Sequence, residues 1–162
     1  MEPSELAAVA GRYRDMIYRV ALHWCGHPQE AEDATQDTLL KLCATHRTFA
    51  DEEHLKSWLI RVTINCSKKW LCSAWMKRTV PLDESLPFPQ QQDRDVYFAV
   101  LELPAQYRTV IHLHYYERMP VEEMAQVLSI SESAVKSRLY RARNLLREML
   151  KEEFDEHVPK TL

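Results

Sequence analysis

Glycine is nearly absent from this sequence of 162 residues, which contains only Gly11 and Gly26. Folds rich in β-strands place glycine at many of their turns, so this scarcity argues against a sheet and favours helices. No apolar stretch approaches the roughly 20 residues that a membrane-spanning helix needs, and no secretory signal precedes the first expected helix. We therefore expect an all-α protein located in the cytoplasm.

Cysteine is also sparse, and no two cysteines have the C-x-x-C spacing of a metal or redox site. Isolated cysteines in a cytosolic chain are typically reduced thiols. His23 and His27 resemble a metal-binding pair, but Gly26 and Pro28 interrupt the helix that would place both on one face, which leaves a metal there as a minor alternative. No nucleophile, general base or phosphate-binding loop stands out, so we expect no catalytic residue, enzyme activity, metal, cofactor or small-molecule substrate. The cysteines are Cys25, Cys43, Cys66 and Cys72.

Charge is unevenly distributed along the chain, although the net charge is only −3. Residues 61–78 contain five Lys or Arg and no Asp or Glu, and residues 135–151 contain six against one. The remaining segments are acidic. Compact basic blocks attract phosphate groups even when the whole chain is acidic. The pattern indicates two separate contacts with nucleic acid and leaves acidic surfaces for a protein partner.

Three stretches in the first half of the chain have helical periodicity. Hydrophobic residues recur at spacings of three and four over residues 5–25, 29–46 and 55–78. Gly26 and Pro28 separate the first two helices. An amphipathic helix that contributes to a core is a sufficient interpretation of the first one.

The second of these helices has an acidic outer face. Its expected core residues are Ala31, Ala34, Thr38, Leu42 and Cys43. Its expected outer residues are Glu30, Asp33, Gln36, Asp37 and Lys41, with Leu40 among them. Acidic residues early in a helix are also favoured by its dipole, so part of this pattern is local stabilisation. An exposed leucine on such a face is compatible with a protein-docking surface.

The third helix combines cations and aromatic residues. Opposite its core stripe we expect Arg61, Asn65, Lys68 and Lys69. Cations attract phosphates regardless of sequence, and aromatic side chains between them can stack on bases exposed in a single strand. Trp70 and Trp75 fit either this role or the core.

A linker rich in proline follows over residues 79–92. Beyond it we expect one helix over residues 93–103 and another that starts after Pro104, because proline is well tolerated in the first helical turn. The chain thus divides into a domain at 1–78 and a domain at 93–162. The linker extends to at most about 50 Å, and with two domains it spans duplex sites about 85 Å apart, about 25 base pairs.

The stretch from Val121 to Leu150 has the pattern of a helix-turn-helix. A short helix leads into a longer one that we expect to begin near Ser131, a residue suited to N-capping. The longer helix has a stripe of core residues at Val135, Leu139, Ala142, Leu146 and Met149. Its opposite face consists of Lys136, Ser137, Tyr140, Arg141 and Asn144. Such a helix can enter a DNA major groove, whereas an ordinary helical hairpin with a solvated basic face is the alternative.

The order of these segments resembles the extracytoplasmic-function (ECF, group 4) sigma factors of bacterial RNA polymerase. The stretches EAEDATQDTLLKL and LKSWLIRVTINCSKKWL, followed by the helix-turn-helix, carry the resemblance, which covers roughly residues 5–152. Each stretch is modestly specific alone, but their order and spacing together are highly specific. One departure lies in the turn, where Ser129 stands at a position often occupied by glycine.

The resemblance implies roles for residues of the first domain. It places Asp33, Gln36, Asp37, Leu40 and Lys41 in a helix that docks on the β′ clamp helices of core RNA polymerase. It implies that the loop before the third helix and the helix itself open the minus-ten element and hold a flipped base. Phe49 lies near the base-capturing loop, and Asn65 matches a residue that contacts DNA. Arg61, Lys68 and Lys69 extend this expected DNA-binding surface.

In the second domain the resemblance implies recognition of the minus-thirty-five element. The residues expected to contact DNA there are Lys136, Ser137, Arg138, Tyr140 and Arg141. Lys or Arg can donate to guanine in the major groove. The implied partners are core RNA polymerase, through its β′ clamp helices and β flap, promoter DNA and an anti-sigma factor, which in some cases holds such a protein at the membrane.

We therefore predict an all-α sigma factor with two small helical domains, a region 2 domain and a region 4 domain. It binds core polymerase and directs transcription initiation at specific promoters. The main alternative is a stand-alone helix-turn-helix regulator of duplex DNA. The basic, tryptophan-rich helix 55–78 argues against that alternative, because a regulator that binds only duplex DNA has no use for a second cationic and aromatic surface.

Overall fold

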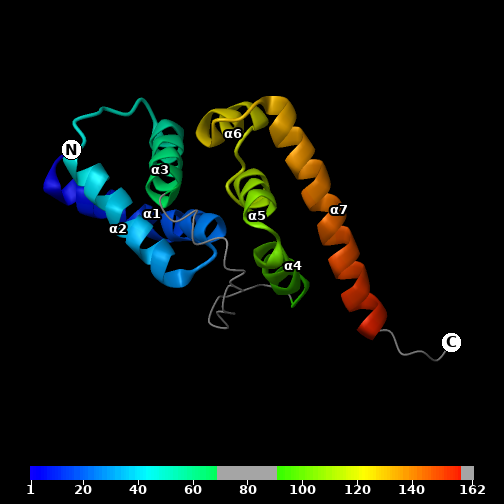
Figure 1. Cartoon of the computed structure of the whole chain (residues 1–162). Helices are drawn as coiled ribbons and strands as arrows, with labels where there is room; N and C mark the ends of the chain where they lie inside the picture. The colour runs from blue at the N-terminus through cyan, green and yellow to red at the C-terminus, as the bar shows by residue number, and fades with distance from the viewer. Residues whose placement is uncertain (69–90, 158–162) are drawn as a thin grey trace.

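The computed structural model describes residues 1–68 and 91–157, and within these ranges every regular element is a helix (Figure 1). Lys69, the end of the expected third helix and most of the expected linker lie outside the described residues. In the part of the chain that is described, no helix is both long and apolar enough to cross a membrane.

The first half forms three mutually packed helices: α1 (Pro3–Cys25), α2 (Pro28–Ala44) and α3 (Glu52–Ser67). The predicted stop and restart between α1 and α2 is confirmed. Gly26 adopts a left-handed conformation, with φ of 72°, and its N–H donates to the carbonyl of Leu22, which ends α1. Pro28 then opens α2. The side chain of Asp51 caps α3 by accepting from the N–H of His54.

The core stripe predicted for α2 is right at four of its five positions, and one residue predicted on the outer face is buried. Ala31, Ala34, Thr38 and Leu42 are buried as expected. Cys43, expected inside, is exposed, whereas Glu30, expected outside, is buried. Helical spacing alone could not separate these cases, because both residues lie at the edge of the apolar stripe, where the neighbouring helix decides burial.

The second half consists of α4 (Gln91–Glu102), α5 (Ala105–Ile111), a π-helical turn η2 (His112–Tyr116), α6 (Val121–Leu128) and α7 (Glu132–His157). A helix does start directly after Pro104, as predicted, and α4 begins two residues before its expected start. The apolar pattern of residues 93–117 predicts six core residues, and five of them are buried: Leu101, Leu103, Val110, Ile111 and Leu113. The sixth, Tyr115, is 51% exposed, so that prediction is wrong.

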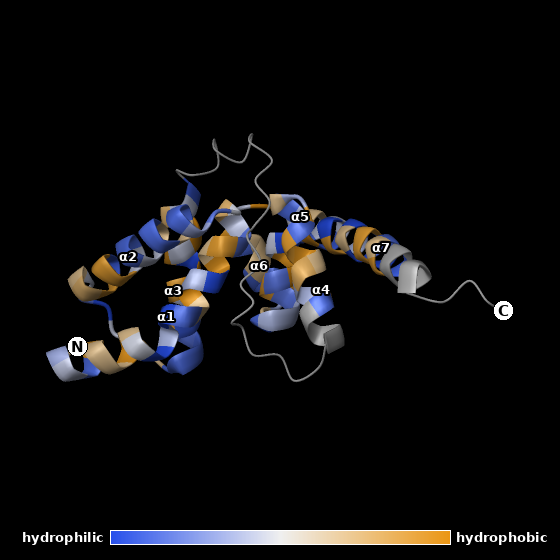
Figure 2. Ribbon diagram, turned by 90° about the horizontal axis from the view of Figure 1, so that it is seen from below, coloured by the Kyte–Doolittle hydropathy of each residue, from blue (hydrophilic) through white to orange (hydrophobic). Residues whose placement is uncertain are grey.

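The two halves are packed against each other rather than held apart. α1 contacts α5 and η2, and α3 contacts α6 (Figure 1). One continuous hydrophobic cluster contains residues of both halves, such as Ile17 and Leu59 from the first and Val110 and Met124 from the second. Figure 2 shows hydrophobic stretches on α3, α5 and α6 in the middle of the molecule, where the two halves meet. This arrangement brings the N-terminal helices directly against the helix-turn-helix.

Candidate nucleic-acid interface

The helix-turn-helix consists of α6, a tight turn and α7. Ser129 ends α6 in a left-handed conformation, with φ of 56° and ψ of 43°. The N–H of Ile130 then donates to the carbonyl of Ala125, which satisfies a carbonyl that the end of the helix leaves open. Ser131 caps α7 as predicted, because its hydroxyl oxygen accepts from the N–H of Ala134 at 3.0 Å. The turn therefore sets the direction of α7 through specific hydrogen bonds.

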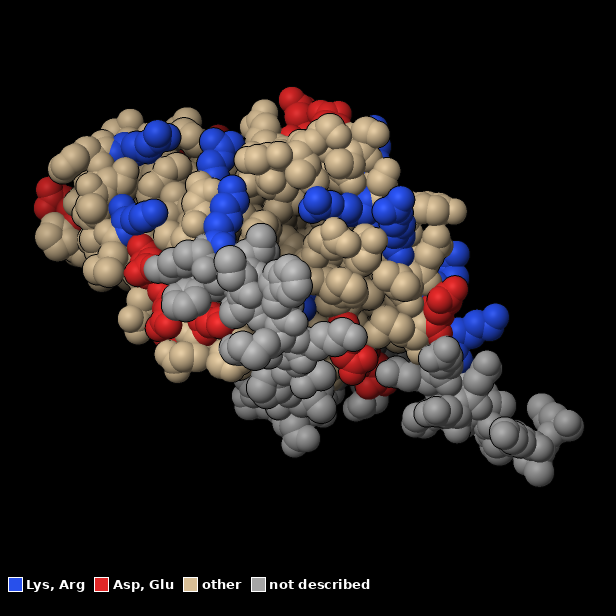
Figure 3. All heavy atoms as spheres, viewed as in Figure 1, with Lys and Arg blue, Asp and Glu red and all other residues tan. Residues whose placement is uncertain are grey.

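The predicted division of α7 into a buried and an exposed face is confirmed over residues 135–142, whereas Asn144, Leu146 and Met149 are all half-buried. Val135, Leu139 and Ala142 are fully or almost fully buried against the rest of the second half. On the other side, the exposed residues are Lys136, Ser137, Tyr140 and Arg141, with Tyr140 65% exposed. Figure 3 shows basic side chains along α7 on one face of the molecule. We call these four exposed residues the α7 face.

Arg138 lies apart from the α7 face. Its side chain is half-buried and lines a hollow of about 440 Å³ with Trp24 of α1 and Leu128 of α6. Arg138 is thus directed toward the contact between the two halves rather than toward the outer side of α7.

The basic face of α3 is exposed but lies next to the helix-turn-helix. Arg61, Asn65 and Lys68 are all exposed. Arg61 and Asn65 line a groove of about 390 Å³ whose other wall consists of Gln126, Val127 and Ser129. The structure therefore brings the residues expected to contact an opened strand into one groove with α6 and its turn.

Phe49 lies in the loop before α3 and is half-buried. Its ring contacts those of Trp58 and His54, with centroids 5.3 and 5.5 Å away. The same ring lines an open hollow of about 530 Å³ between the loop, the N-terminal half of α1 and the start of α3, with Arg12 and Arg47 also in its lining. This site combines an aromatic surface with two arginines, of which Arg12 pairs with Glu52, and the carboxylates of Glu5 and Asp51 also line it.

The five residues expected to dock on the polymerase all lie along one side of α2. Their spacing of three and four residues aligns them on that side. Gln36, Leu40 and Lys41 are exposed, with Leu40 66% exposed, while Asp33 and Asp37 are half-buried. A largely exposed leucine flanked by carboxylates is a small apolar contact point in an acidic surrounding. We call this surface the α2 face.

A buried polar contact joins the two halves at the end of α1. The guanidinium group of Arg108 in α5, only 7% exposed, donates to the carbonyls of His23 and Trp24, and the Thr109 hydroxyl donates to the same His23 carbonyl. The C-terminal carbonyls of a helix carry partial negative charge and favour a cation. Gly26 makes this approach possible, since a Cβ there would lie 2.4 Å from Nη2 of Arg108.

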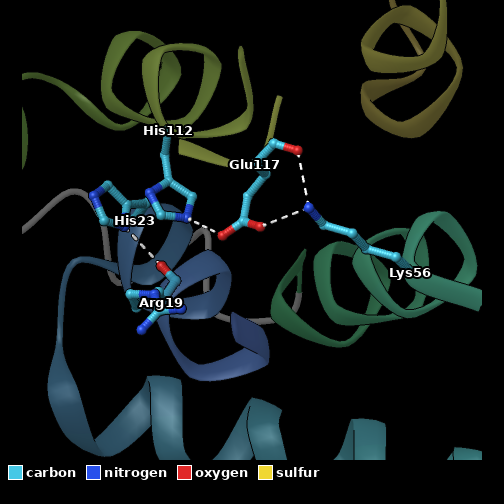
Figure 4. A network of polar contacts seen from close by, with 5 residues as sticks. All are labelled: Arg19, His23, Lys56, His112 and Glu117. Atoms are coloured by element: carbon cyan, nitrogen blue, oxygen red, sulfur yellow. Dashed lines mark hydrogen bonds and ion pairs between the residues drawn. The ribbon is translucent and has the colours of Figure 1, made fainter. Parts of the chain in front are cut away.

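Two buried histidines stack across the same contact (Figure 4). The rings of His23 in α1 and His112 in η2 lie 3.9 Å apart at 24°, and both side chains are almost completely buried. Nδ1 of His23 lies 2.7 Å from the carbonyl of Arg19, and Nε2 of His112 lies 3.2 Å from Oε1 of Glu117. The π-helical turn helps here, because the N–H of Glu117 donates to the carbonyl of His112, which folds the Glu117 side chain back onto the ring.

Glu117 also connects the two halves through Lys56 of α3. The Lys56 ammonium group lies 3.3 Å from Oε2 of Glu117 and donates to the Glu117 carbonyl at 3.0 Å. Burial by itself raises the pKa of Glu117. The hydrogen bond from His112 and the charge of Lys56 outweigh burial and lower this pKa below its ordinary value. Nearby, Ser57 of α3 donates to the carboxylate of Glu123 in α6.

Burial lowers the pKa of both stacked histidines. For His23 the pKa falls well below 6.5, since burial, His112 and the guanidinium groups of Arg108 and Arg19 all disfavour a second proton. For His112 burial outweighs the opposing effect of Glu117, so its pKa is also lowered. Both rings are therefore neutral at pH 7.

Helical patterning did not reveal this contact. In the sequence His23 was paired only with His27, whereas the structure stacks it on His112, 89 positions further along the chain. Arg108 and His112 do carry one sequence signal, because they flank Val110 and Ile111 within a largely apolar and aromatic run. Such residues are buried only when they have partners, but the pattern does not reveal which partners.

Comparisons with known proteins agree with this architecture. The family described as sigma-70 region 2 matches residues 9–76, and the family described as sigma-70, region 4 matches residues 93–146. The RNA polymerase sigma factor SigV of Bacillus subtilis is 29% identical over 87% of this chain and 88% of its own length. The RNA polymerase sigma-E factor of Streptomyces coelicolor is 31% identical over 85% of this chain and 81% of its own.

A solved structure has the same fold. It is the sigma factor RpoE of Bartonella quintana in complex with the anti-sigma factor NepR, with a TM-score of 0.63, 28% identity and coverage of 91% of this chain and 95% of that chain. The stand-alone regulator is not favoured, because both sigma regions are matched in order along one chain. This protein accordingly belongs to the ECF group of RNA polymerase sigma factors, and its function is promoter-directed initiation of transcription with RNA polymerase.

Proposed function

We propose that promoter recognition is divided between the two halves of this sigma factor. The region 4 domain, residues 93–162, reads the minus-thirty-five element as duplex. The region 2 domain, residues 1–78, docks on the polymerase and opens the minus-ten element. The observation that carries this assignment is the α7 face, because its four polar or basic residues lie opposite a fully buried stripe in a capped helix-turn-helix.

The α7 face suits direct readout of base edges. Lys136 and Arg141 are exposed donors suited to guanine O6 and N7 in the major groove. Ser137 and Tyr140 add hydroxyl groups for bases or phosphates. Arg138 contributes from the side, through a backbone phosphate, because its half-buried position keeps it away from the outer side of α7.

The face of α3 and the hollow beside Phe49 suit an opened strand. Arg61, Lys68 and the neighbouring Lys69 supply charge for the backbone, and Asn65 supplies a donor and an acceptor for a base. The hollow of about 530 Å³ offers an aromatic ring and two arginines to a flipped base. Unstacking a base costs a few kcal/mol, which such contacts offset.

The α2 face is the proposed docking surface for the β′ clamp helices. Leu40 supplies an exposed apolar contact, and the surrounding side chains Asp33, Gln36, Asp37 and Lys41 supply polar contacts. Small apolar centres with polar rims are typical of protein interfaces. The region 4 domain contacts the β flap in the same complex.

Further partners follow from the related proteins. The Bartonella quintana sigma factor was solved with an anti-sigma factor, and we propose that this chain is likewise held inactive by one, in the cytoplasm and in some cases at the membrane. The chain itself binds and positions the promoter and the polymerase without covalent chemistry, so that no catalytic residue, metal or cofactor is required.

Exchange of Asp37 for arginine tests the docking assignment. Asp37→Arg reverses a charge in the middle of the α2 face, so we expect at least about tenfold weaker binding to core polymerase, the effect of about 1.4 kcal/mol. Pull-down of core polymerase and transcription from a linear promoter template are the measurements. The matched control is Asp15→Arg, which reverses an exposed charge on α1, outside the α2 face. Equal binding by both variants would refute the assignment.

A further inference from the structure

α6 and its turn form one wall of the groove that contains part of the basic face of α3. Gln126, Val127 and Ser129 lie on one side of this groove, and the exposed Arg61 and Asn65 lie on the other. A strand bound along α3 would therefore have α6 directly beside it. Separation of the two halves would remove this wall and widen the path of the strand along α3.

We propose that the polar contact between the two halves is a latch that keeps the chain closed, and that protonation of the stacked His23–His112 pair releases it. The latch consists of Arg108 on the carbonyls at the end of α1, the histidine stack, and Glu117 held by Lys56. The consequence for promoters rests on the proposed role of α3. The opening itself is a property of the free chain.

The contact between Arg108 and the end of α1 is the part of the latch that does not depend on pH. Arg108 reaches the carbonyls of His23 and Trp24 beside Gly26, where a Cβ would lie 2.4 Å from Nη2 of Arg108, and Gly26 also has a positive φ that other residues adopt at a cost. Opening the chain leaves these helix-end carbonyls to water and frees the guanidinium group from a buried site. This part of the latch keeps its charge at any pH near neutrality, since arginine does not titrate there.

The histidine stack is the part that senses protons. A carbonyl only accepts, so Nδ1 of His23 carries its proton and donates to Arg19; Nε2 of His112 likewise donates to the carboxylate of Glu117. The opposite nitrogens, Nε2 of His23 and Nδ1 of His112, are buried and have no hydrogen-bond partner among the described residues. A second proton on either ring would therefore create a buried N–H without an acceptor.

The surroundings of the stack disfavour a positive charge. From α1 and α5 the guanidinium groups of Arg19 and Arg108 act on His23, and from α3 the ammonium group of Lys56 acts on His112. The rings of Tyr97 in α4 and Tyr116 in η2 cover the remaining sides, at 5.6 Å from His23 and 5.5 Å from His112. Of the two histidines, only His112 is hydrogen-bonded to the carboxylate of Glu117.

The direction of the pH effect follows from these positions. In the open form the histidines are hydrated and their pKa returns toward 6.5, whereas in the closed form the pKa is lowered. The open form thus binds more protons below about pH 6.5. Closure is fully favoured above that value and weakens as the pH falls through it. Because the pKa of Glu117 is also lowered in the closed form, further acidification below its ordinary value of 4.5 acts in the same direction.

Small-angle X-ray scattering of the free full-length chain at pH 8 and pH 5.5 tests the latch. We expect a radius of gyration near about 15 Å at pH 8, the value for a compact chain of this length, and above about 20 Å at pH 5.5, when two separate domains tumble on a linker. A double variant, His23→Phe and His112→Phe, keeps two stacked rings that cannot be protonated. It should remain compact at both pH values.

A second pair of variants keeps the test decisive if the double variant does not fold. Gly26→Ala strains the turn and displaces Arg108, so we expect an expanded chain at both pH values. Gly11→Ala is the matched control, because a Cβ at Gly11 meets nothing within 4 Å and the residue lies within α1. Far-UV circular dichroism should report the same helix content for both variants.

Three results would each overturn the proposal. They are a wild-type chain that is expanded at pH 8, a folded wild-type chain with the same radius at both pH values, and a Gly26→Ala variant as compact as Gly11→Ala. Expansion of the folded double phenylalanine variant at pH 5.5 would remove the histidine pair as the sensor. Polymerase and DNA are absent from every sample, so an error in the proposed roles of α2, α3 or α7 would leave these outcomes unchanged.

Discussion

The α7 face and the basic face of α3 differ in what lies beside them. Lys136, Tyr140 and Arg141 are exposed on the outer side of a helix whose other side is buried. Arg61 and Asn65 are also exposed, but they share a groove with α6. A duplex can approach a single helix from outside, whereas an opened strand needs a clear path along a surface. Contact between the two halves therefore affects the second face far more than the first.

The largest effect should come from the α7 face, because nothing in the closed chain protects or replaces it. We expect Arg141→Ala to reduce transcription from promoters with a strong minus-thirty-five element by about 10- to 100-fold, the loss of one base contact of about 1–3 kcal/mol. The measurement is run-off transcription with reconstituted holoenzyme. Arg147→Ala removes an exposed arginine later on the same helix and is the matched control. Similar output from both variants would show that charge alone, rather than the α7 face, matters.

Opening the chain should change DNA binding by the basic face of α3 and leave DNA binding by the α7 face unchanged. If closure limits strand binding by α3, only the open form of the chain binds single-stranded DNA, and the apparent affinity falls in proportion to the fraction of open chains. Gly26→Ala should increase that fraction and raise the affinity by up to about tenfold. Binding to a duplex minus-thirty-five element should stay the same. Fluorescence anisotropy with both DNA forms is the measurement, and Gly11→Ala is the control. An equal gain for duplex and single strand would contradict the comparison.

Asn65 should matter for opening rather than for the first encounter with DNA. Loss of one hydrogen bond to an extruded base costs about 1 kcal/mol, so we expect Asn65→Ala to reduce promoter opening about fivefold and closed-complex formation very little. Permanganate footprints report opening, and gel shifts at low temperature report the closed complex. Ser57→Ala, which removes a contact of α3 with Glu123 of α6, is a useful counterpart. It should not reduce opening, and equal losses in both assays for Asn65→Ala would refute its role.

The features that the sequence revealed are those set by near neighbours along the chain. The buried stripe of α7, the cap at Ser131 and the break at Gly26 and Pro28 depend on helical spacing, capping and backbone geometry within a few residues. These rules also located the α7 face and the basic face of α3, since a residue opposite the stripe is exposed. The family resemblance then supplied their expected roles.

The contact between the two halves depends on partners far apart in the chain. Helical spacing shows that a residue turns away from solvent but not which helix covers it. His112 and Arg108 are buried because α1 covers them, whereas no helix covers the exposed Tyr115, whose hydroxyl accepts a hydrogen bond from Arg143 of α7. The turn of the helix-turn-helix was a smaller uncertainty, because Ser129 stands where glycine is frequent in related proteins.

The structure resolves that turn, and Ser129 allows the smallest prediction. Its φ of 56° lies in the left-handed region, where a side chain costs about 1–2 kcal/mol, while glycine loses about 0.5–1 kcal/mol of chain entropy on folding. We therefore expect Ser129→Gly to raise the free energy of unfolding by about 0.5–1 kcal/mol, as measured by urea denaturation. Ser137→Gly, in the middle of α7, should lower it by about 0.5 kcal/mol, because glycine is the poorer helix former. If Ser129→Gly were as destabilising as Ser137→Gly, the left-handed turn between α6 and α7, and with it the direction of the α7 face, would have to be revised.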